Sequence, residues 1–125
     1  MSDFSKTNLR ALENMAPKFG LPAGFEARFA KSALDAAELA VSLQKLGPNQ
    51  VSPFAHRHKE QPEELYVVVA GSGTITIDDA PQPLATWDVV HVAGPTLRSF
   101  AAGPDGLEFL AFGQNGPSDA ELIQL

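Results

Sequence analysis

The sequence contains no cysteine, which excludes disulfide bonds and thiolate sites for metals or redox chemistry. It has no apolar run near the roughly 20 residues that a membrane-spanning helix needs. The charged N-terminal residues are not followed by the apolar stretch of a secretory signal. Basic residues are few, since 9 lysines and arginines against 15 acidic residues give a net charge of −6. Nucleic acids and anionic membranes attract basic surfaces, so neither is an expected partner, and we expect a cytoplasmic protein.

What the sequence does contain points to a folded domain with many turns. The 125 residues fit one domain, and 44% of them are hydrophobic, which is enough for a packed core. Glycine and proline number 10 each, and both residues favour turns between short elements. This composition favours an all-β architecture.

One helix pattern lies near the start, where Leu9, Leu12 and then Met15 or Ala16 recur at helical spacing before Pro17. From residue 25 onward, alternating or apolar segments separated by turn residues predict strands. The expected strands are 37–46, 64–70, 74–77, 89–92, 97–100 and 107–112. The expected turns are 47–49, a hairpin turn at 71–73, 78–81, 94–95 and a tight turn at 103–106.

Strands that follow one another without intervening helices predict a sandwich or barrel rather than a parallel α/β sheet. We expect residues 1–24 to form an N-terminal extension with a short helix and residues 25–115 to form the barrel. Residues 116–125 are expected as a C-terminal tail.

The segment His56-Arg57-His58 carries the clearest chemical signal. Alternate residues of a strand point to one face, so both imidazoles would converge, and a carboxylate follows at Glu63 or Glu64. Two imidazoles and a carboxylate are a donor set that divalent first-row metals accept. The alternative is an exposed, charged loop, because short histidine motifs often lack a function.

The spacing of His56, His58, Glu64 and Gly71 resembles the first motif of the cupin superfamily: His-x-His, three or four residues, Glu, six residues, Gly. The gap before Glu64 is one residue longer than in that motif, which leaves Glu63 as a stand-in. The second cupin motif is matched only in character. Trp87, Ala93, Pro95 and Arg98 stand where that motif has glycine, proline, glycine and its last histidine.

The resemblance implies an all-β double-stranded β-helix, or jelly-roll barrel, with a site in its lumen. It implies that His56, His58 and Glu64 face inward as ligands of a divalent transition metal (Fe, Mn, Ni or Zn), although a site without metal is equally open. Arg98, Tyr66, Gln44 and Phe100 are expected to contact a bound small molecule. His91 lies on the opposite strand face and is expected to be structural.

Arg98 is the most informative departure, because a guanidinium has no lone pair for a metal. It would pair with Glu64 and leave a metal-free pocket, or clamp the carboxylate or phosphate of a ligand. A third alternative is a surface salt bridge with an acid such as Glu108.

Three functions stay open on this basis, and the sequence does not decide whether the protein is an enzyme. The first is binding of a small, anionic molecule in a lumen that is metal-free or weakly metallated. The second is a metal-dependent oxygenase or isomerase that uses His56, His58 and Glu64. The third is a structural homodimer with a vestigial site, suggested by the outward apolar stripe Leu65, Val67 and Val69.

Overall fold

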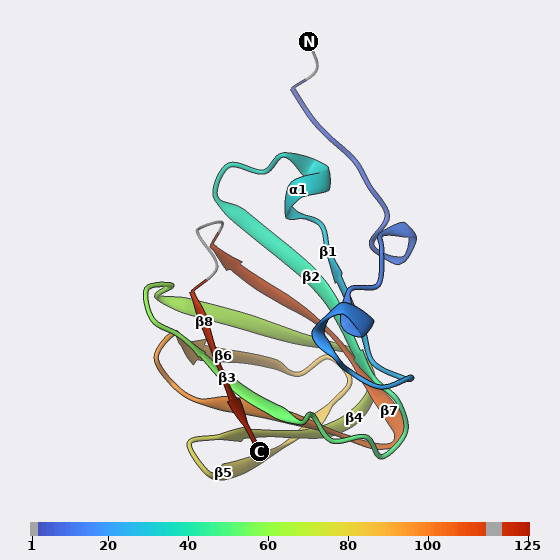
Figure 1. The fold of residues 1–125 in the computed structure, drawn as a ribbon, viewed down its shortest axis with the longest axis vertical. Coiled ribbons are helices and arrows are strands. Elements are labelled where there is room, and N and C mark those ends of the chain that lie inside the picture. The colour runs from blue at the N-terminus through green and yellow to red at the C-terminus, as the bar shows by residue number, and fades with distance from the viewer. Residues whose placement is uncertain (1–2, 115–118) are drawn as a thin grey trace.

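The computed structural model describes residues 3–114 and 119–125 as a curled antiparallel sheet with a few short helical segments (Figure 1). The predicted all-β jelly-roll barrel is confirmed. No helix among the described residues is long and apolar enough to cross a membrane. The strands are β1 (Glu26–Phe29), β2 (Leu39–Leu46), β3 (Phe54–His58), β4 (Glu63–Ile77), β5 (Ala80–Ala85), β6 (Val89–Ala93), β7 (Arg98–Gln114) and β8 (Ala120–Gln124).

Two long strands, β4 and β7, organise the sheet. They pair with each other along most of their length, from Leu65 opposite Phe112 to Ile77 opposite Arg98. The second half of β7 also pairs with β2, which in turn pairs with β1. The other edge of β4 pairs with β6 in its first part and with β5 in its last part. β3 pairs with β8 and, at one position, with β7. The sheet therefore curls around a core that includes Tyr66, Val68, Ile75, Phe100, Leu107 and Phe109.

The expected hairpin turn at 71–73 and the expected tight turn at 103–106 are both wrong. β4 and β7 run through these segments without reversing, and the β4–β7 register shifts between Val68 and Ala70 and between Gly71 and Gly73. Gly71 has a φ of 73°, and a Cβ there would overlap the Gly106 carbonyl oxygen. A Cβ on Gly73 would overlap the Ala101 carbonyl oxygen. These glycines permit a bulge and a close backbone approach between two continuous strands.

The other expected turns are present. Asp78 and Asp79, with φ values of 46° and 68°, form the β4–β5 hairpin turn. Turns also occur at 48–49 and 94–95. The described part of the predicted tail contributes β8, in which Ala120 pairs with His58 and Gln124 with Phe54. The division of the chain at residues 24 and 115 stays a prediction.

The N-terminal segment is helical only in short turns. It forms 3-10 turns at Leu9–Ala11 and Ala16–Phe19, and a single α-helical turn, α1 (Lys31–Leu34), follows β1. The expected helix ending at Pro17 is therefore replaced by two separate turns, and proline occupies the start of the second one, where its missing N–H costs little. Asn14 ties this segment to the barrel, because its side chain bonds the backbone of Phe25 and Ala27.

The exterior of β4 carries apolar residues, as the alternation predicted. Leu65 is 41% exposed, and Val89 on the neighbouring β6 is 61% exposed. A second subunit on this face stays a prediction.

We expect Gly71→Ala to destabilise the protein much more than Gly20→Ala. Both positions have a positive φ, which disfavours alanine by about 1 kcal/mol, but only the Cβ at residue 71 meets backbone atoms within 4 Å. The clash should add at least about 2 kcal/mol to the loss of unfolding free energy, measured by urea denaturation. Equal losses for the two variants would contradict this account of the β4–β7 crossing.

Candidate metal and ligand site

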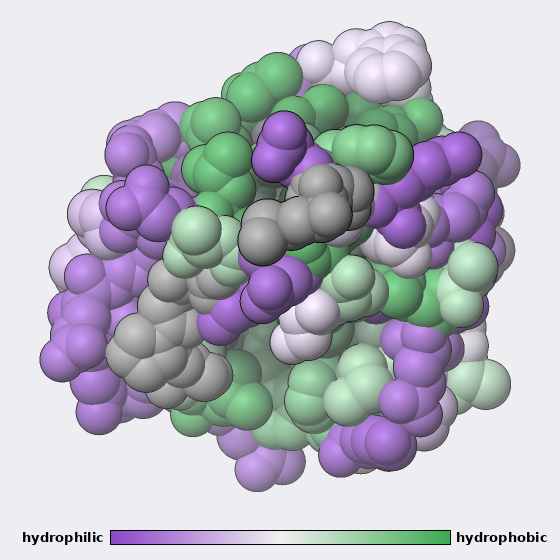
Figure 2. Space-filling model, turned by 90° about the horizontal axis from the view of Figure 1, so that it is seen from above, coloured by the Kyte–Doolittle hydropathy of each residue, from purple (hydrophilic) through white to green (hydrophobic). Residues whose placement is uncertain are grey.

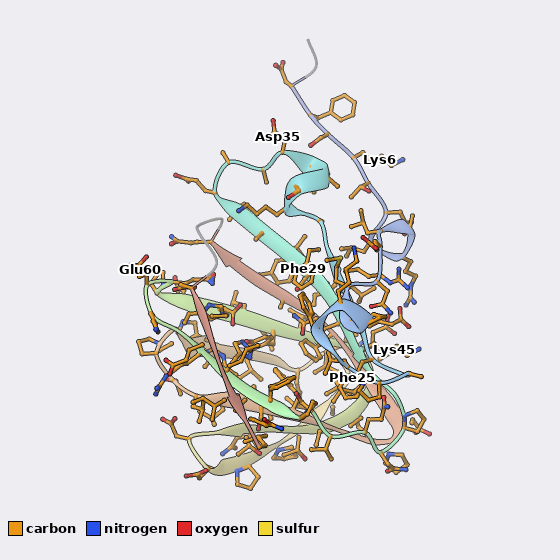
Figure 3. All side chains as sticks on the ribbon, viewed as in Figure 1. Lys6, Phe25, Phe29, Asp35, Lys45 and Glu60 are labelled. Atoms are coloured by element: carbon orange, nitrogen blue, oxygen red, sulfur yellow. The ribbon has the colours of Figure 1, made fainter. Side chains whose placement is uncertain are left out.

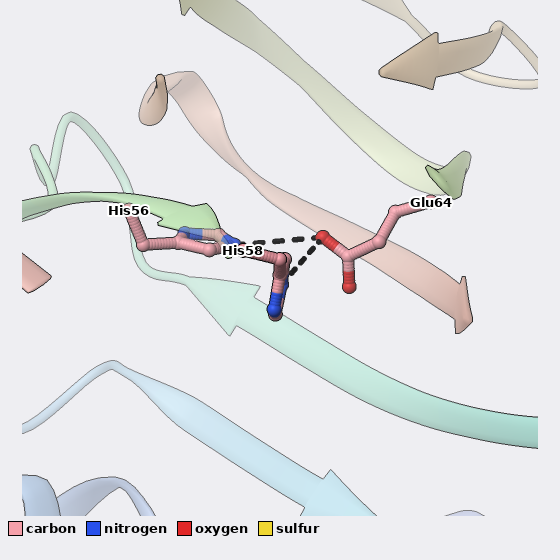
Figure 4. Close-up of side chains that lie close together, drawn as sticks. All are labelled: His56, His58 and Glu64. Atoms are coloured by element: carbon pink, nitrogen blue, oxygen red, sulfur yellow. Dashed lines mark ion pairs between the residues drawn. The ribbon is translucent and has the colours of Figure 1, made fainter. Parts of the chain in front are cut away.

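Two strands that follow one another in the chain, β3 and β4, bring His56, His58 and Glu64 together inside the barrel (Figure 4). The two histidines lie on β3, and Glu64 is the second residue of β4. Nε2 of His56 and Nε2 of His58 lie 3.5 Å and 3.1 Å from the same oxygen, Oε1 of Glu64. One ligand atom from each residue lies within 4.8 Å of the other two. A single metal ion could therefore reach all three, which is the arrangement the motif spacing predicted.

Glu64 Oε1 is also the acceptor for two protein donors. Tyr66 donates its hydroxyl proton over 2.5 Å, and Arg98 donates from Nη2 over 2.9 Å. Burial of Glu64 raises its pKa, but hydrogen bonds from His56 and Tyr66 and the nearby imidazoles lower it to about 2 overall. Burial raises the pKa of Tyr66 above its usual range, so the phenol stays protonated and acts as a donor. The carboxylate is thus held ionised at neutral pH.

Arg98 is completely buried behind this carboxylate. Besides Glu64, it donates to the Tyr66 hydroxyl and to the backbone carbonyls of Gly94 and Thr96. Pairing with Glu64 is therefore the arrangement the structure has, and the alternative of a surface salt bridge with Glu108 is wrong. Glu108 instead accepts from Arg10, 2.6 Å away.

Asp119 is a site residue that the sequence analysis missed. Its Oδ1 lies 2.9 Å from Nδ1 of His58, and its Oδ2 accepts the backbone N–H groups of Glu60 and Gln61 at 2.6 and 2.7 Å. The Gln61 hydrogen bond above all, with those from Glu60 and His58, holds the pKa of Asp119 well below its usual range against the opposing effect of burial. No local motif points to Asp119, which is 61 residues from His58.

The contact with Asp119 leaves His58 Nε2 in an unusual state. A carboxylate only accepts hydrogen bonds, so the shared proton belongs on Nδ1, and in the neutral ring Nε2 then keeps the lone pair. That buried Nε2 has no hydrogen-bond partner within the described residues, although Glu64 Oε1 is close. Two acceptor atoms that face each other in a buried site need a cation or a proton between them. A carboxylate behind a ligating imidazole is also the usual companion of metal-binding histidines, so the residues fit a metal.

A cavity of about 630 Å³ adjoins this cluster. Its polar wall includes Ser42, Gln44, Ser52 and Gln61, together with His56, His58 and Glu64. Its apolar wall includes Phe19, Leu21, Phe29, Phe54 and Leu122. Phe29 projects from β1 (Figure 3), and the view from above shows hydrophobic side chains mixed with hydrophilic ones on this face (Figure 2). This volume is in the range of sites for small molecules.

Of the four residues predicted to contact a ligand, Gln44 lies in the cavity wall. Tyr66, Phe100 and Arg98 do not line the cavity and are buried, at 2%, 8% and 0% exposure. Phe100 stacks on Phe109 with ring centroids 4.4 Å apart, so its contacts are those of a core residue. The hydrogen bonds of Arg98 go to Glu64, Tyr66 and two backbone carbonyls, so they do not favour the expected direct clamp on a ligand.

Glu63 and His91 lie on the outside of the barrel. The Glu63 carboxylate contacts His91 Nε2 at 2.8 Å, and both side chains are more than half exposed. Glu63 therefore does not stand in for Glu64, and His91 lies away from the cluster, as its strand parity predicted.

We expect the Glu64 carboxylate to stabilise the folded state above about pH 4.5 and to lose this effect as the pH falls toward 2. Its folded pKa of about 2 lies below the ordinary value of 4.5, so protonation favours the unfolded chain. The difference in unfolding free energy between the wild type and Glu64→Gln should shrink by about 3 kcal/mol between pH 6 and pH 2, measured by urea denaturation. For Glu63→Gln, the matched exposed control, the difference should change little. A Glu64→Gln difference that is constant with pH would show that this carboxylate is not held ionised.

The chain was compared with protein families, with curated proteins and with solved structures. No family model matches the chain. Dimethylsulfoniopropionate lyase DddW of Ruegeria pomeroyi is 34% identical over 73 residues, which are 58% of this chain and 45% of that protein. The matched segment thus spans less than half the length of that curated relative.

Among solved structures, a cupin protein of Bacteroides fragilis superposes with a TM-score of 0.73 at 25% identity, covering 94% of this chain and 89% of that one. A mutant oxalate decarboxylase of Bacillus subtilis superposes with a TM-score of 0.77 at 22% identity. That match covers the whole of this chain and 33% of the decarboxylase. These structures share the curled β-barrel described above.

Proposed function

Starting from the finding that this chain belongs to the cupin superfamily, we propose that it holds a divalent transition metal through His56, His58 and Glu64 and binds a small molecule in the adjoining cavity. The observation that carries the proposal is the buried Nε2 of His58. This nitrogen has no hydrogen-bond partner, although it faces a carboxylate oxygen of Glu64. Nδ1, on the other side of the ring, contacts Asp119. A metal held by these three residues would give Nε2 of His58 the partner that it lacks.

The charges around the cluster support weak rather than tight metal binding. A guanidinium and a divalent cation about 5 Å apart repel by about 7 kcal/mol at an effective dielectric constant near 20. Arg98 supplies this repulsion, because its Nη2 lies 2.9 Å from the carboxylate that would hold the metal. The carboxylates of Glu64 and Asp119 offset it. Three protein ligands also leave positions of the metal open for a substrate.

The residues around the metal position have separate tasks in this proposal. Asp119 orients His58, while Tyr66 and Arg98 hold Glu64 Oε1 in place by donating to it. A bound divalent metal would act as a Lewis acid and supply the positive charge that attracts an acidic ligand. Gln44 and Ser42 would contact polar groups of that ligand, and the phenylalanine-rich wall would exclude water from it.

The fold does not fix the reaction, because one barrel hosts many chemistries. The named relatives include a lyase and a decarboxylase, each acting on a small acid according to its name. The lyase is the relative with 34% identity, so we propose cleavage of a small carboxylate as the reaction class, with dimethylsulfoniopropionate as the first compound to assay on metal-loaded protein.

We expect His58→Ala to lower the affinity for Mn²⁺, Fe²⁺, Ni²⁺ and Zn²⁺ by about 100-fold or more, because one of only three ligands is lost. His91→Ala is the matched control, since His91 is exposed on the opposite face and should bind metal like the wild type. Affinity would be measured by competition with chromophoric chelators on untagged protein, and bound metal by elemental analysis. Failure of the loaded wild type to retain any of the four metals would refute the proposed site.

A metal-free binding module is the second candidate, and the Arg98–Glu64 ion pair favours it. In that case the guanidinium takes the place that a metal would otherwise fill. Arg98→His would remove the buried positive charge and add a fourth possible ligand. We therefore expect this variant to take up at least about 10-fold more metal than the wild type at equal free metal concentration, on the basis of the charge removed. Unchanged uptake would count against Arg98 as the group that limits metal binding.

A further inference from the structure

We propose that Asp119 is a positioning residue, which fixes the tautomer of His58 and so makes Nε2 available as a metal ligand. The inference rests on the proposed metal site, but its first consequence is a property of the metal-free protein. Asp119 lies outside the histidine motif, directly before β8.

Asp119 is itself held so that only one of its oxygens can serve His58. Oδ2 accepts two backbone N–H groups, from Glu60 at 2.6 Å and from Gln61 at 2.7 Å. Oδ1 is left to contact His58 Nδ1 at 2.9 Å, and only 11% of either side chain is exposed. An ionised carboxylate cannot donate a proton, so the hydrogen in this contact must come from Nδ1. The neutral imidazole then carries its lone pair on Nε2.

The strand pairing explains how this contact is built. β8 pairs with β3 over its whole length, and His58 lies opposite Ala120, the neighbour of Asp119. Asp119 therefore arrives beside His58 as β8 docks, and it also accepts from Glu60 and Gln61 in the middle of the β3–β4 connection. One side chain thereby joins the strand that carries both histidines to the segment that leads into Glu64.

The same strand offers a matched control. Glu121 is two residues further along β8 and accepts from Arg57 of β3 at 3.1 and 3.2 Å on the outer surface. Like Asp119, Glu121 is an acid that contacts a residue of β3, but it does not face the cluster. Changing Glu121 tests the loss of a β3–β8 ion pair without changing the surroundings of His58.

Asp119→Asn gives the sharpest test, because the two backbone donors dictate how an asparagine must lie. Its single oxygen is needed by the N–H groups of Glu60 and Gln61, which turns its NH₂ group toward Nδ1 of His58. The imidazole must then accept on Nδ1 and carry its hydrogen on Nε2. The variant keeps the shape of the wild type but reverses the tautomer.

The experiment is a long-range ¹H–¹⁵N correlation spectrum of the histidine rings in metal-free protein at pH 8, together with Zn²⁺ affinity by chelator competition. We expect the wild type and Glu121→Gln to show His58 protonated on Nδ1, and Asp119→Asn to show it protonated on Nε2. Zn²⁺ affinity should fall 10- to 100-fold in Asp119→Asn and stay within about twofold in Glu121→Gln.

Two results would overturn the inference: a wild-type His58 protonated on Nε2, or an Asp119→Asn protein with unchanged tautomer and affinity. If the wild type binds no Zn²⁺ or other divalent metal, the proposed function fails. The tautomers then still decide whether Asp119 positions His58. Asp119→Ala serves as a second variant if the asparagine protein does not fold, and it should lose the preference for the Nδ1 proton along with affinity.

Discussion

One carboxylate oxygen, Oε1 of Glu64, is the point on which the interior of this barrel depends. It accepts from the Tyr66 hydroxyl and the Arg98 guanidinium, and it faces Nε2 of both His56 and His58. A buried guanidinium needs a partner, because an unpaired charge in an apolar interior costs several kcal/mol. Glu64 therefore supports the packing of β7 against β4 and also forms the acidic corner of the site.

Because Glu64 pairs with Arg98 as well as facing the two histidines, the site differs from one in which every polar residue is a metal ligand. Arg98 occupies the position where the sequence motif would place a further histidine, and it is anchored by the carbonyls of Gly94 and Thr96. Its charge is fixed at any physiological pH and competes with a metal for Glu64. Asp119 adds a second negative charge beside His58. The balance of these three permanent charges governs how strongly the cluster attracts a cation.

The sequence predicted those features of the structure that depend on short spacing. Alternation along β3 placed His56 and His58 on one face, and parity along β4 placed Glu64, Tyr66 and Val68 inside and Leu65 outside. The general resemblance to cupins predicted the barrel. Strand parity also separated His91 from the site, whereas Glu63 stayed open as a stand-in and the structure places it on the outside.

Features set by contacts between distant segments were not predictable in this way. Glycine marks both turns and close backbone approaches, so the pattern at 71–73 indicated a hairpin where two continuous strands cross. Tyr66 was expected to touch a ligand because it shares Glu64's face, and Arg98 because it takes the position of the last cupin histidine. Both side chains are buried, and Tyr66 packs against Phe100 and Phe109. Asp119 had no local signal, because it meets His58 only through the β3–β8 pairing.

Sequence separation also sets an order in which the cluster can assemble during folding. His58 and Glu64 are brought close by a short connection, whereas the Arg98 contact to Glu64 spans 34 residues and the Asp119 contact to His58 spans 61. Closing a longer loop costs more chain entropy, so contacts between distant residues generally form late. A chain whose last strand has not yet docked would already carry both imidazoles and the carboxylate, but its His58 ring would be free to rotate. The orientation of the His58 ring would therefore be the last property of the cluster to be fixed.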